Sequence, residues 1–146
     1  MRVALLFSFG LSLIAGTLPA VPTTPPPGSF ERHAICDAVR DFLAKQRGSS
    51  IERRLFKIEA LRVDGSFAYF EGFFANADGT PAAVGTADDI VFNIFLKREG
   101  KAWRVIRDLS RTDVPSEDEQ AAIRRDFPRE IPFSIIPTFW RKILAR

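Results

Sequence analysis

The sequence predicts an α+β domain in which an N-terminal helix packs on a four-stranded antiparallel sheet and a helical extension follows. Three observations predict this class. Apolar residues recur at helical spacing between Ser29 and Gly48, they alternate with period two in paired segments from residue 55 to residue 109, and helix signals return after residue 115. A chain of 146 residues has room for one such domain.

The first twenty residues form a separate segment. Arg2 precedes a fourteen-residue apolar run from Val3 to Gly16, and Pro19 and Ala20 follow. This is the three-part pattern of a secretory signal peptide, and the run is shorter than the roughly 20 residues that a membrane span needs. We therefore expect residues 1–20 to be cleaved near Ala20 and the protein to be exported to the periplasm or the extracellular space, with an uncleaved anchor as the alternative.

The charge of the mature chain is nearly balanced. The sequence holds 21 basic and 18 acidic residues, and Arg2 is the one charged residue among the first twenty. Removal of that segment leaves 20 basic residues against 18 acidic ones, a net charge of about +2. A nucleic-acid-binding domain needs a concentrated basic face, so this composition argues against a nucleic-acid partner.

Residues 21–28, which include the stretch PTTPPPG, are predicted to be a proline-rich spacer because they hold too few apolar side chains to pack. The α+β domain is expected over residues 29–114. Ser29 is the expected N-cap of its helix, with the acidic Glu31 in the first turn, and Gly48 is the expected stop. The apolar face of this helix consists of Ile35, Ala38, Val39, Phe42 and Leu43.

Four segments with strand periodicity are joined by two tight turns. Asp64-Gly65 separates LFKIEALRV (55–63) from SFAYFEGFF (66–74), and Glu99-Gly100 separates IVFNIFLKR (90–98) from KAWRVIRDL (101–109). Both dipeptides are interpreted as two-residue hairpin turns. Counting outward from the first turn gives the pairs Arg62 with Phe67, Ala60 with Tyr69, Ile58 with Glu71 and Phe56 with Phe73.

The second hairpin is apolar on both faces. One face is a period-two stripe that is expected to pack on the helix, and it consists of Ile90, Phe92, Ile94, Leu96, Trp103, Val105 and Leu109. The opposite face carries Val91, Phe95 and Ile106. Since apolar surface of this kind is rarely left open to water, we expect another part of the chain to cover it.

The helical extension, residues 115–146, can supply that cover. Ser116 and Glu119 form an S-x-x-E capping box that opens a short helix, which Pro128 closes. A last amphipathic helix carries Phe139, Trp140, Ile143 and Leu144. The alternative is an interaction surface for a partner protein or a membrane, formed by Phe139, Trp140, Arg141 and Lys142, because cations beside aromatic side chains also suit an interfacial helix.

The two hairpins, LRVDGSFAYFEGFF and LKREGKAWRVIRDLSRTDV, and the helix before them resemble small exported bacterial proteins of cystatin-like or NTF2-like architecture, most of them uncharacterised. The resemblance covers residues 30–114, and the Trp103-Arg104-Val105 strand is its strongest local feature. NTF2-like domains include ligand-binding and enzymatic members. The resemblance therefore implies a pocket between helix and sheet without implying a reaction.

Signatures of catalysis and of metal binding are missing from the sequence. A metal site needs several His, Cys or carboxylate ligands at matched spacing, and the chain has one histidine and one cysteine. No G-x-S-x-G motif surrounds a serine, and no glycine-rich loop leads from a strand into a helix. We expect no cofactor and no metal, and the sequence favours a protein that is not an enzyme.

The polar residues on the strands are the candidate ligand-binding site: Tyr69, Glu71, Asn93 and Arg107. Arg107 is notable because Trp103, Val105 and Leu109 flank it at even spacing, and a charge on an apolar stripe needs a partner. Glu71 is the expected partner. Acid–base catalysis by Glu71 or by Asp108 would need a raised carboxyl pKa, which a sequence does not reveal.

Two functions follow as hypotheses. The favoured one is a secreted or periplasmic non-catalytic domain that binds a protein or envelope component through its C-terminal aromatic segment. The alternative is a small-molecule-binding NTF2-like pocket, with or without enzymatic activity, which uses the four polar strand residues. An open polar cavity between helix and sheet would favour the pocket, whereas a filled interior together with exposed Phe139 and Trp140 would favour the binding domain.

The single histidine and the single cysteine lie three residues apart in the first helix, at His33 and Cys36. Three residues rotate by about 300° around a helix, which places Cys36 at the border of the apolar stripe and His33 towards solvent. Asp37 and Glu31 in the same helix oppose a thiolate. We therefore predict that Cys36 is a packing residue with an ordinary or raised thiol pKa.

Overall fold

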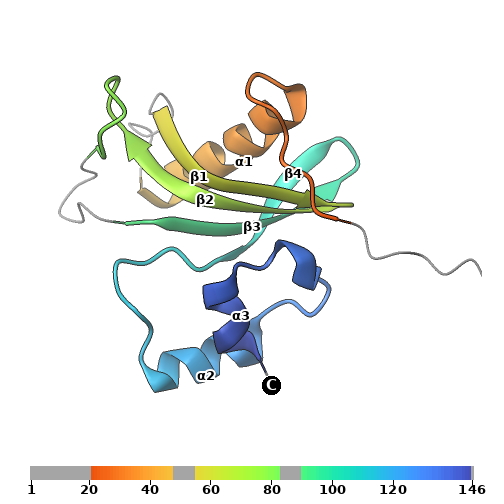
Figure 1. The fold of residues 1–146 in the computed structure, drawn as a ribbon, viewed down its shortest axis with the longest axis vertical. Helices are drawn as coiled ribbons and strands as arrows, with labels where there is room; N and C mark the ends of the chain where they lie inside the picture. The colour runs from red at the N-terminus through yellow and green to blue at the C-terminus, as the bar shows by residue number, and fades with distance from the viewer. Residues whose placement is uncertain (1–20, 48–54, 83–89, 146) are drawn as a thin grey trace, which may run out of the picture.

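The computed structural model describes residues 21–47, 55–82 and 90–145, so the expected signal peptide and the expected helix stop at Gly48 lie outside the described residues. The described chain forms three layers (Figure 1). Helix α1 covers one face of an antiparallel sheet, and the C-terminal helices α2 and α3 lie against the other face. The predicted α+β class, with a helix on a four-stranded sheet and C-terminal helices after it, is confirmed.

Helix α1 (Phe30–Arg47) begins where the sequence predicts. The Oγ atom of Ser29 accepts a hydrogen bond from the N–H of Arg32 at 3.3 Å, which satisfies one of the free donors of the first turn. Ile35, Val39 and Leu43 are fully buried against the sheet. Their spacing therefore drives the docking of α1, because each apolar side chain that is removed from water stabilises the fold.

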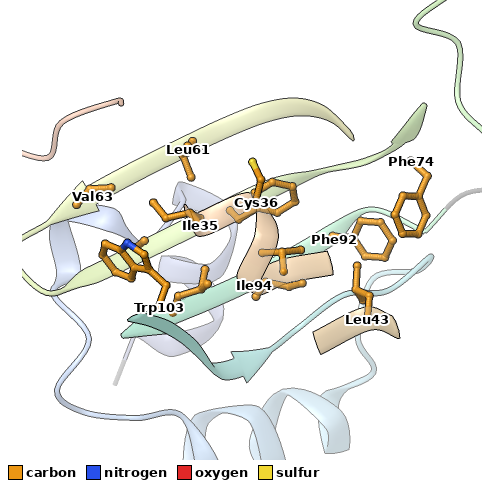
Figure 2. Packing of buried hydrophobic residues seen from close by; sticks show 13 residues of the cluster. Ile35, Cys36, Leu43, Leu61, Val63, Phe74, Phe92, Ile94 and Trp103 are labelled. Atoms are coloured by element: carbon orange, nitrogen blue, oxygen red, sulfur yellow. The ribbon is translucent and has the colours of Figure 1, made fainter. Parts of the chain in front are cut away.

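The sheet has the order β1-β2-β3-β4, with every neighbouring pair antiparallel. Its strands are β1 (Leu55–Asp64), β2 (Phe67–Ala75), β3 (Phe92–Glu99) and β4 (Ala102–Asp108). Figure 2 shows the core between α1 and the sheet, in which Ile35 and Cys36 of the helix meet Leu61, Ile94 and Trp103 of the strands. Phe56, Phe70, Phe74 and Phe92 extend this core with ring contacts of 4.9–6.2 Å between centroids.

The hairpin turns differ from the prediction by one residue each. The central residues are Gly65-Ser66 and Gly100-Lys101, since Asp64 pairs with Phe67 and Glu99 with Ala102. Gly65 and Gly100 have φ angles of 58° and 62° at the first central position, as type II′ turns require. The first hairpin is consequently shifted, so that Arg62 lies opposite Tyr69 and Ala60 opposite Glu71. A bulge further along the strand then puts Ile58 opposite Gly72 and Phe56 opposite Phe74.

A register shift between Ile58 and Ala60 makes Glu59 an extra residue in β1. Before this bulge Ile58 faces α1, and after it Ala60 faces the C-terminal layer. Gly72 of β2 lies opposite the bulge, where a Cβ atom would stand 2.4 Å from the carbonyl oxygen of Lys57. Glycine is therefore needed at this point for two backbones to approach closely.

A second register shift changes the expected faces of β4. Leu96 pairs with Val105 but Phe95 pairs with Arg107, so Ile106 is the extra residue. Trp103 and Val105 stay on the α1 side as predicted, whereas Leu109 packs in the cluster on the opposite side. The assignment of Leu109 to the helix-facing stripe was thus wrong, because a one-residue bulge reverses the alternation of faces.

The proline-rich segment docks on the sheet and is not a free spacer. Thr23 and Val63 exchange two backbone hydrogen bonds of 2.8 Å along the outer edge of β1. Pro25 is buried, and its carbonyl oxygen accepts a hydrogen bond from Arg32 at 3.1 Å. This corrects the expectation that the segment does not pack. Backbone hydrogen bonds anchor it, and a prediction that counts apolar side chains cannot register these.

The C-terminal layer consists of α2 (Glu117–Asp126), the 3₁₀ turn η2 (Phe133–Ile135) and α3 (Thr138–Leu144). Ser116 and Glu119 form the predicted capping box, and the helix ends at the C-cap Phe127, directly before Pro128. The second face of the sheet is covered as predicted. Its buried cluster comprises Tyr69, Phe95, Leu109, Ile123, Ile131, Ile135, Ile136, Trp140 and Ile143.

Candidate functional site

The structure brings together three of the four candidate ligand residues, on the face of the sheet that the C-terminal layer covers. Tyr69, Glu71 and Asn93 lie on neighbouring strands, and Glu71 pairs with Asn93 in the ladder. Tyr69 is fully buried beneath the C-terminal layer. These three residues therefore do not lie between α1 and the sheet, where the resemblance implied a pocket. A hollow of about 320 Å³ does lie between α1 and β4, beside the aromatic core, but none of the four candidate ligand residues is among the residues that line it.

Hydrogen bonds join these residues to the last helix. The Tyr69 hydroxyl is 2.8 Å from Oε2 of Glu71 and 2.7 Å from Oδ1 of Asn93, so its proton can be donated to either oxygen. Nε1 of Trp140 donates to the same Asn93 oxygen at 2.9 Å. The sequence did not predict Trp140 in this network. A buried indole needs an acceptor for its N–H, and that requirement is the signal that could have linked it to a polar strand residue.

Asn93 also holds the end of the β3–β4 hairpin. Its backbone N–H donates to Oγ of Ser110 at 3.1 Å, and Ser110 donates through its own hydroxyl and its own N–H to Oδ1 of Asp108. The side-chain amide of Asn93 donates to the carbonyl oxygen of Val91 at 3.2 Å. Asp108, a candidate for acid–base catalysis, thus serves as the acceptor of a turn.

The electrostatics of the network favour a neutral tyrosine. Burial is the main cause that raises the pKa of Tyr69 far above its ordinary value, and the hydrogen bond to Glu71 raises it further. A phenol held neutral is a hydrogen-bond donor and a poor base. The Tyr69–Glu71–Asn93–Trp140 network, named here the Tyr69 network, is suited to joining the sheet to α3.

Arg107 is separated from Glu71. The bulge at Ile106 turns Arg107 towards the C-terminal layer, and the described residues show no ion pair between Arg107 and Glu71, which corrects the predicted partnership. The Arg107 charge instead reaches Asp126, where it adds to the larger effect of the Arg125 hydrogen bond in lowering the carboxyl pKa. The Nε atom of Arg107 is buried without a hydrogen-bond partner in the described structure.

The four residues that the sequence proposed as an interaction surface differ in solvent exposure. Trp140 is 2% exposed and belongs to the core, whereas Phe139 is 45% exposed and Lys142 is exposed. Arg141 is half-buried: it donates to the carbonyl oxygens of Ile136 at 2.6 Å and Ser134 at 3.1 Å. The last helix therefore provides cover for the sheet with one side and a partly apolar, cationic surface with the other.

A groove lies beside these residues, between the end of α2, the turn that follows it, η2 and the end of α3. Its volume is about 440 Å³, and none of the lining residues that the structure describes is acidic. The lining residues are Arg124, Phe127, Pro128, Arg129, Ile131, Phe133, Ile136 and Leu144. We name this feature the C-terminal groove. The sequence did not predict this groove, because the segment around Phe133 has no helical or strand period from which a face could be assigned.

His33 and Cys36 lie as the helix rotation predicts. His33 is exposed, and Cys36 is 7% exposed within the core between α1 and the sheet. Burial raises the thiol pKa, and the opposing effects of Arg40 and Arg32 are smaller. The interpretation of Cys36 as a packing residue is confirmed, and the direction of its thiol pKa agrees with the predicted ordinary or raised value.

Within the ranges 21–47, 55–82 and 90–145, no cluster of three or more His, Cys, Asp or Glu side chains is placed to hold a metal ion. In the same ranges, no helix combines the length and the apolar character needed to cross a membrane. Comparisons with protein-family models, curated proteins and solved structures gave no match to this chain.

Proposed function

We propose that this chain is an exported, non-catalytic domain that binds a component of the cell envelope through the C-terminal groove. The observation that carries the proposal is the composition of that groove, whose described lining combines apolar side chains with two arginines and no acidic residue. Exposed apolar surface beside cationic side chains is typical of binding surfaces rather than of ordinary solvated surface. Phe133, on the wall of the groove, is 63% exposed.

Export is the second part of the proposal, and the pattern of residues 1–20 supports it. Sequencing the N-terminus of protein recovered from the extracytoplasmic fraction tests it. We expect the mature chain to begin near Val21. Recovery of the chain with Met1 intact in that fraction would instead support a membrane anchor.

Kinship with cystatin-like or NTF2-like exported proteins is also part of the proposal. The helix that packs across an antiparallel meander, and the hairpins around Gly65 and Gly100, support it. The C-terminal layer is the feature that this chain adds, since it covers the sheet face on which the polar strand residues lie.

A small-molecule pocket lined by Tyr69, Glu71, Asn93 and Arg107 is the weaker candidate. Tyr69 is fully buried, and its hydroxyl is already within hydrogen-bond distance of two acceptors. A ligand would have to displace the Trp140 helix before it reached these groups. Nothing in this geometry favours a reaction there.

Co-sedimentation of the mature protein with purified native envelope tests the binding proposal. The double variant Phe133→Ser/Arg129→Glu should lose most of the sedimenting fraction, because it removes an apolar wall and reverses a charge at the groove. The matched control is Phe30→Ser/Arg104→Glu, which changes an 86% exposed phenylalanine and an exposed arginine outside the C-terminal layer. Equal loss of sedimentation in both variants, or in neither, contradicts the proposal.

A further inference from the structure

The floor of the C-terminal groove is built from side chains that the fold already fixes. Ile131 and Ile136 are 6% and 4% exposed, and both pack in the cluster beneath the C-terminal layer. Phe127 packs edge-on against Phe95 of β3 at 5.2 Å between ring centroids. These contacts make the floor rigid and apolar, as a site for an apolar ligand requires.

The wall of the groove is held in place as well. The guanidinium of Arg141 lies 4.5 Å from the ring centroid of Phe133. Arg141 is itself fixed by its hydrogen bonds to the carbonyl oxygens of Ser134 and Ile136. An exposed aromatic ring that is stacked on an anchored cation loses little conformational entropy when a ligand packs on it, and such preorganisation favours binding.

The charge around the groove is positive. Arg124 donates one hydrogen bond to the carbonyl oxygen of Ile143 at 3.3 Å, and Arg129 makes no hydrogen bond or ion pair with the residues that the structure describes. The nearest acids in sequence have other partners: Asp126 pairs with Arg125 at 2.8 Å, and Glu130 pairs with Lys97 at 3.1 Å. Arg129 is therefore available to an anion, and its planar fork suits a carboxylate.

The size and lining of the groove indicate what the anion is attached to. A volume of about 440 Å³ falls within the range of small-molecule sites, about 300–1,000 Å³. An extended peptide would need hydrogen-bond partners for its backbone, whereas the described lining consists of six apolar residues and two arginines, none of which lies in a strand. An alkyl chain needs no such partners.

We propose that the C-terminal groove binds a long-chain carboxylate, with the alkyl chain along Ile131, Ile136 and Phe133 and the carboxylate at Arg129. This assignment rests on the proposed function and names the chemistry of the envelope component. Arg124, already bound to the Ile143 carbonyl oxygen, adds positive potential at the same end of α2.

Calorimetric titration of the mature protein with monomeric dodecanoate, dodecanol and dodecylammonium tests the proposal. Dodecanoate should bind most tightly. Arg129→Glu should weaken the affinity for dodecanoate by about tenfold, the effect of losing one charge-assisted hydrogen bond. The difference in affinity between dodecanoate and dodecylammonium should therefore become smaller or change sign. The control Arg104→Glu, which changes an exposed arginine of β4, should leave the ranking unchanged. Amide chemical shifts should move for residues 124–144 and stay constant in α1.

Three results would overturn the proposal. The first is equal affinity for all three amphiphiles. The second is dodecanoate binding that Arg129→Glu leaves unchanged, and the third is a set of shifts centred outside residues 124–144. If dodecanoate fails to bind while native envelope still sediments the protein through Phe133 and Arg129, this inference falls and the proposed function stands. Sedimentation with phosphatidylglycerol vesicles in that case would identify a bilayer surface as the occupant, and sedimentation only with protein-containing envelope would identify a protein.

Discussion

At the scale of single residues, the buried polar groups are the ones whose chemistry the fold changes most. Tyr69 is the only tyrosine of the chain, and it is fully buried with two acceptors at its hydroxyl. Trp140, which lies 47 positions after Asn93 in the sequence, donates its indole N–H to the side-chain oxygen of Asn93. Since a buried polar group without a partner destabilises a fold, the Asn93 acceptor of the Trp140 indole N–H helps to fix α3 on the sheet.

Tyr69 should make stability depend on alkaline pH. The folded chain keeps the phenol protonated because its pKa is raised, whereas the unfolded chain loses the proton above its ordinary pKa of about 10. The stabilisation is therefore complete below that pH and falls above it, by about 1.4 kcal/mol for each pH unit. Urea denaturation on both sides of about pH 10 should show a shallower alkaline loss for Tyr69→Phe than for the unmodified protein. Tyrosinate absorbance that appears near pH 10 while the protein is still folded would contradict this account.

Cys36 should behave as a buried side chain. A thiol with a pKa raised by burial reacts slowly in the folded protein, so we expect labelling to follow unfolding and to be insensitive to His33→Ala. Cys36→Ala should cost about 1 kcal/mol, because a small buried side chain is shortened, and it should leave envelope binding unchanged. Rapid labelling at acidic pH that His33→Ala slows would show that the pair is reactive after all.

At the scale of elements, the periodicity of apolar residues predicted the helices and strands correctly. The pairing register of the strands depends on turn positions and bulges, which periodicity does not contain. The positive φ angles of Gly65 and Gly100 put each glycine at the first central position of its turn, one residue away from the prediction. Bulges at Glu59 and Ile106 then exchange the two faces of β1 and β4. A bulge is set by packing across the sheet, which is why the sequence misassigned Leu109 and the partner of Arg107.

Gly72→Ala should destabilise the domain strongly. The added Cβ would meet the Lys57 carbonyl oxygen at 2.4 Å and the Ile58 Cα at 3.2 Å, and both are backbone atoms of a paired strand. We expect a loss of about 3 kcal/mol or more in the free energy of unfolding. Gly79→Ala is the control, because its Cβ meets open space and only its φ of 81° opposes the change, at a cost of about 1 kcal/mol. Denaturant curves compare the free energies of unfolding of the two variants. An equal loss in both would mean that the backbone around the bulge can shift to accommodate the added Cβ atom.

Removal of residues 137–146 should uncover the second face of the sheet. The deletion takes away Trp140 and Ile143, which are 2% and 7% exposed, and it removes part of the apolar cover from the sheet face that carries Tyr69 and Phe95. We expect the Tm to fall by about 10 °C or more. The milder variant Trp140→Phe keeps the ring but loses the hydrogen bond to Asn93, and it should cost about 1 kcal/mol. An unchanged Tm in the truncated protein would show that this segment is not core.

At the scale of the whole molecule, the C-terminal layer packs on the sheet with one side and faces solvent with the other. The sequence predicted that Tyr69, Glu71 and Asn93 share a region, because they lie on adjacent predicted strands. It could not predict their closure by Trp140, since that depends on how a separate segment docks. The sequence could not predict the C-terminal groove for the same reason. Arg129 and Phe133 line it together only because the turn between α2 and α3 brings them there.

Hydrogen exchange on the mature protein, alone and bound to native envelope, tests most directly that the C-terminal groove is the binding surface. The account predicts that envelope slows the exchange of backbone amides within residues 124–144, around the groove lined by Arg129 and Phe133. Exchange in α1 and in the β1–β2 hairpin should stay the same. Slowed exchange centred on α1 or on β4, with residues 124–144 unaffected, would contradict the account.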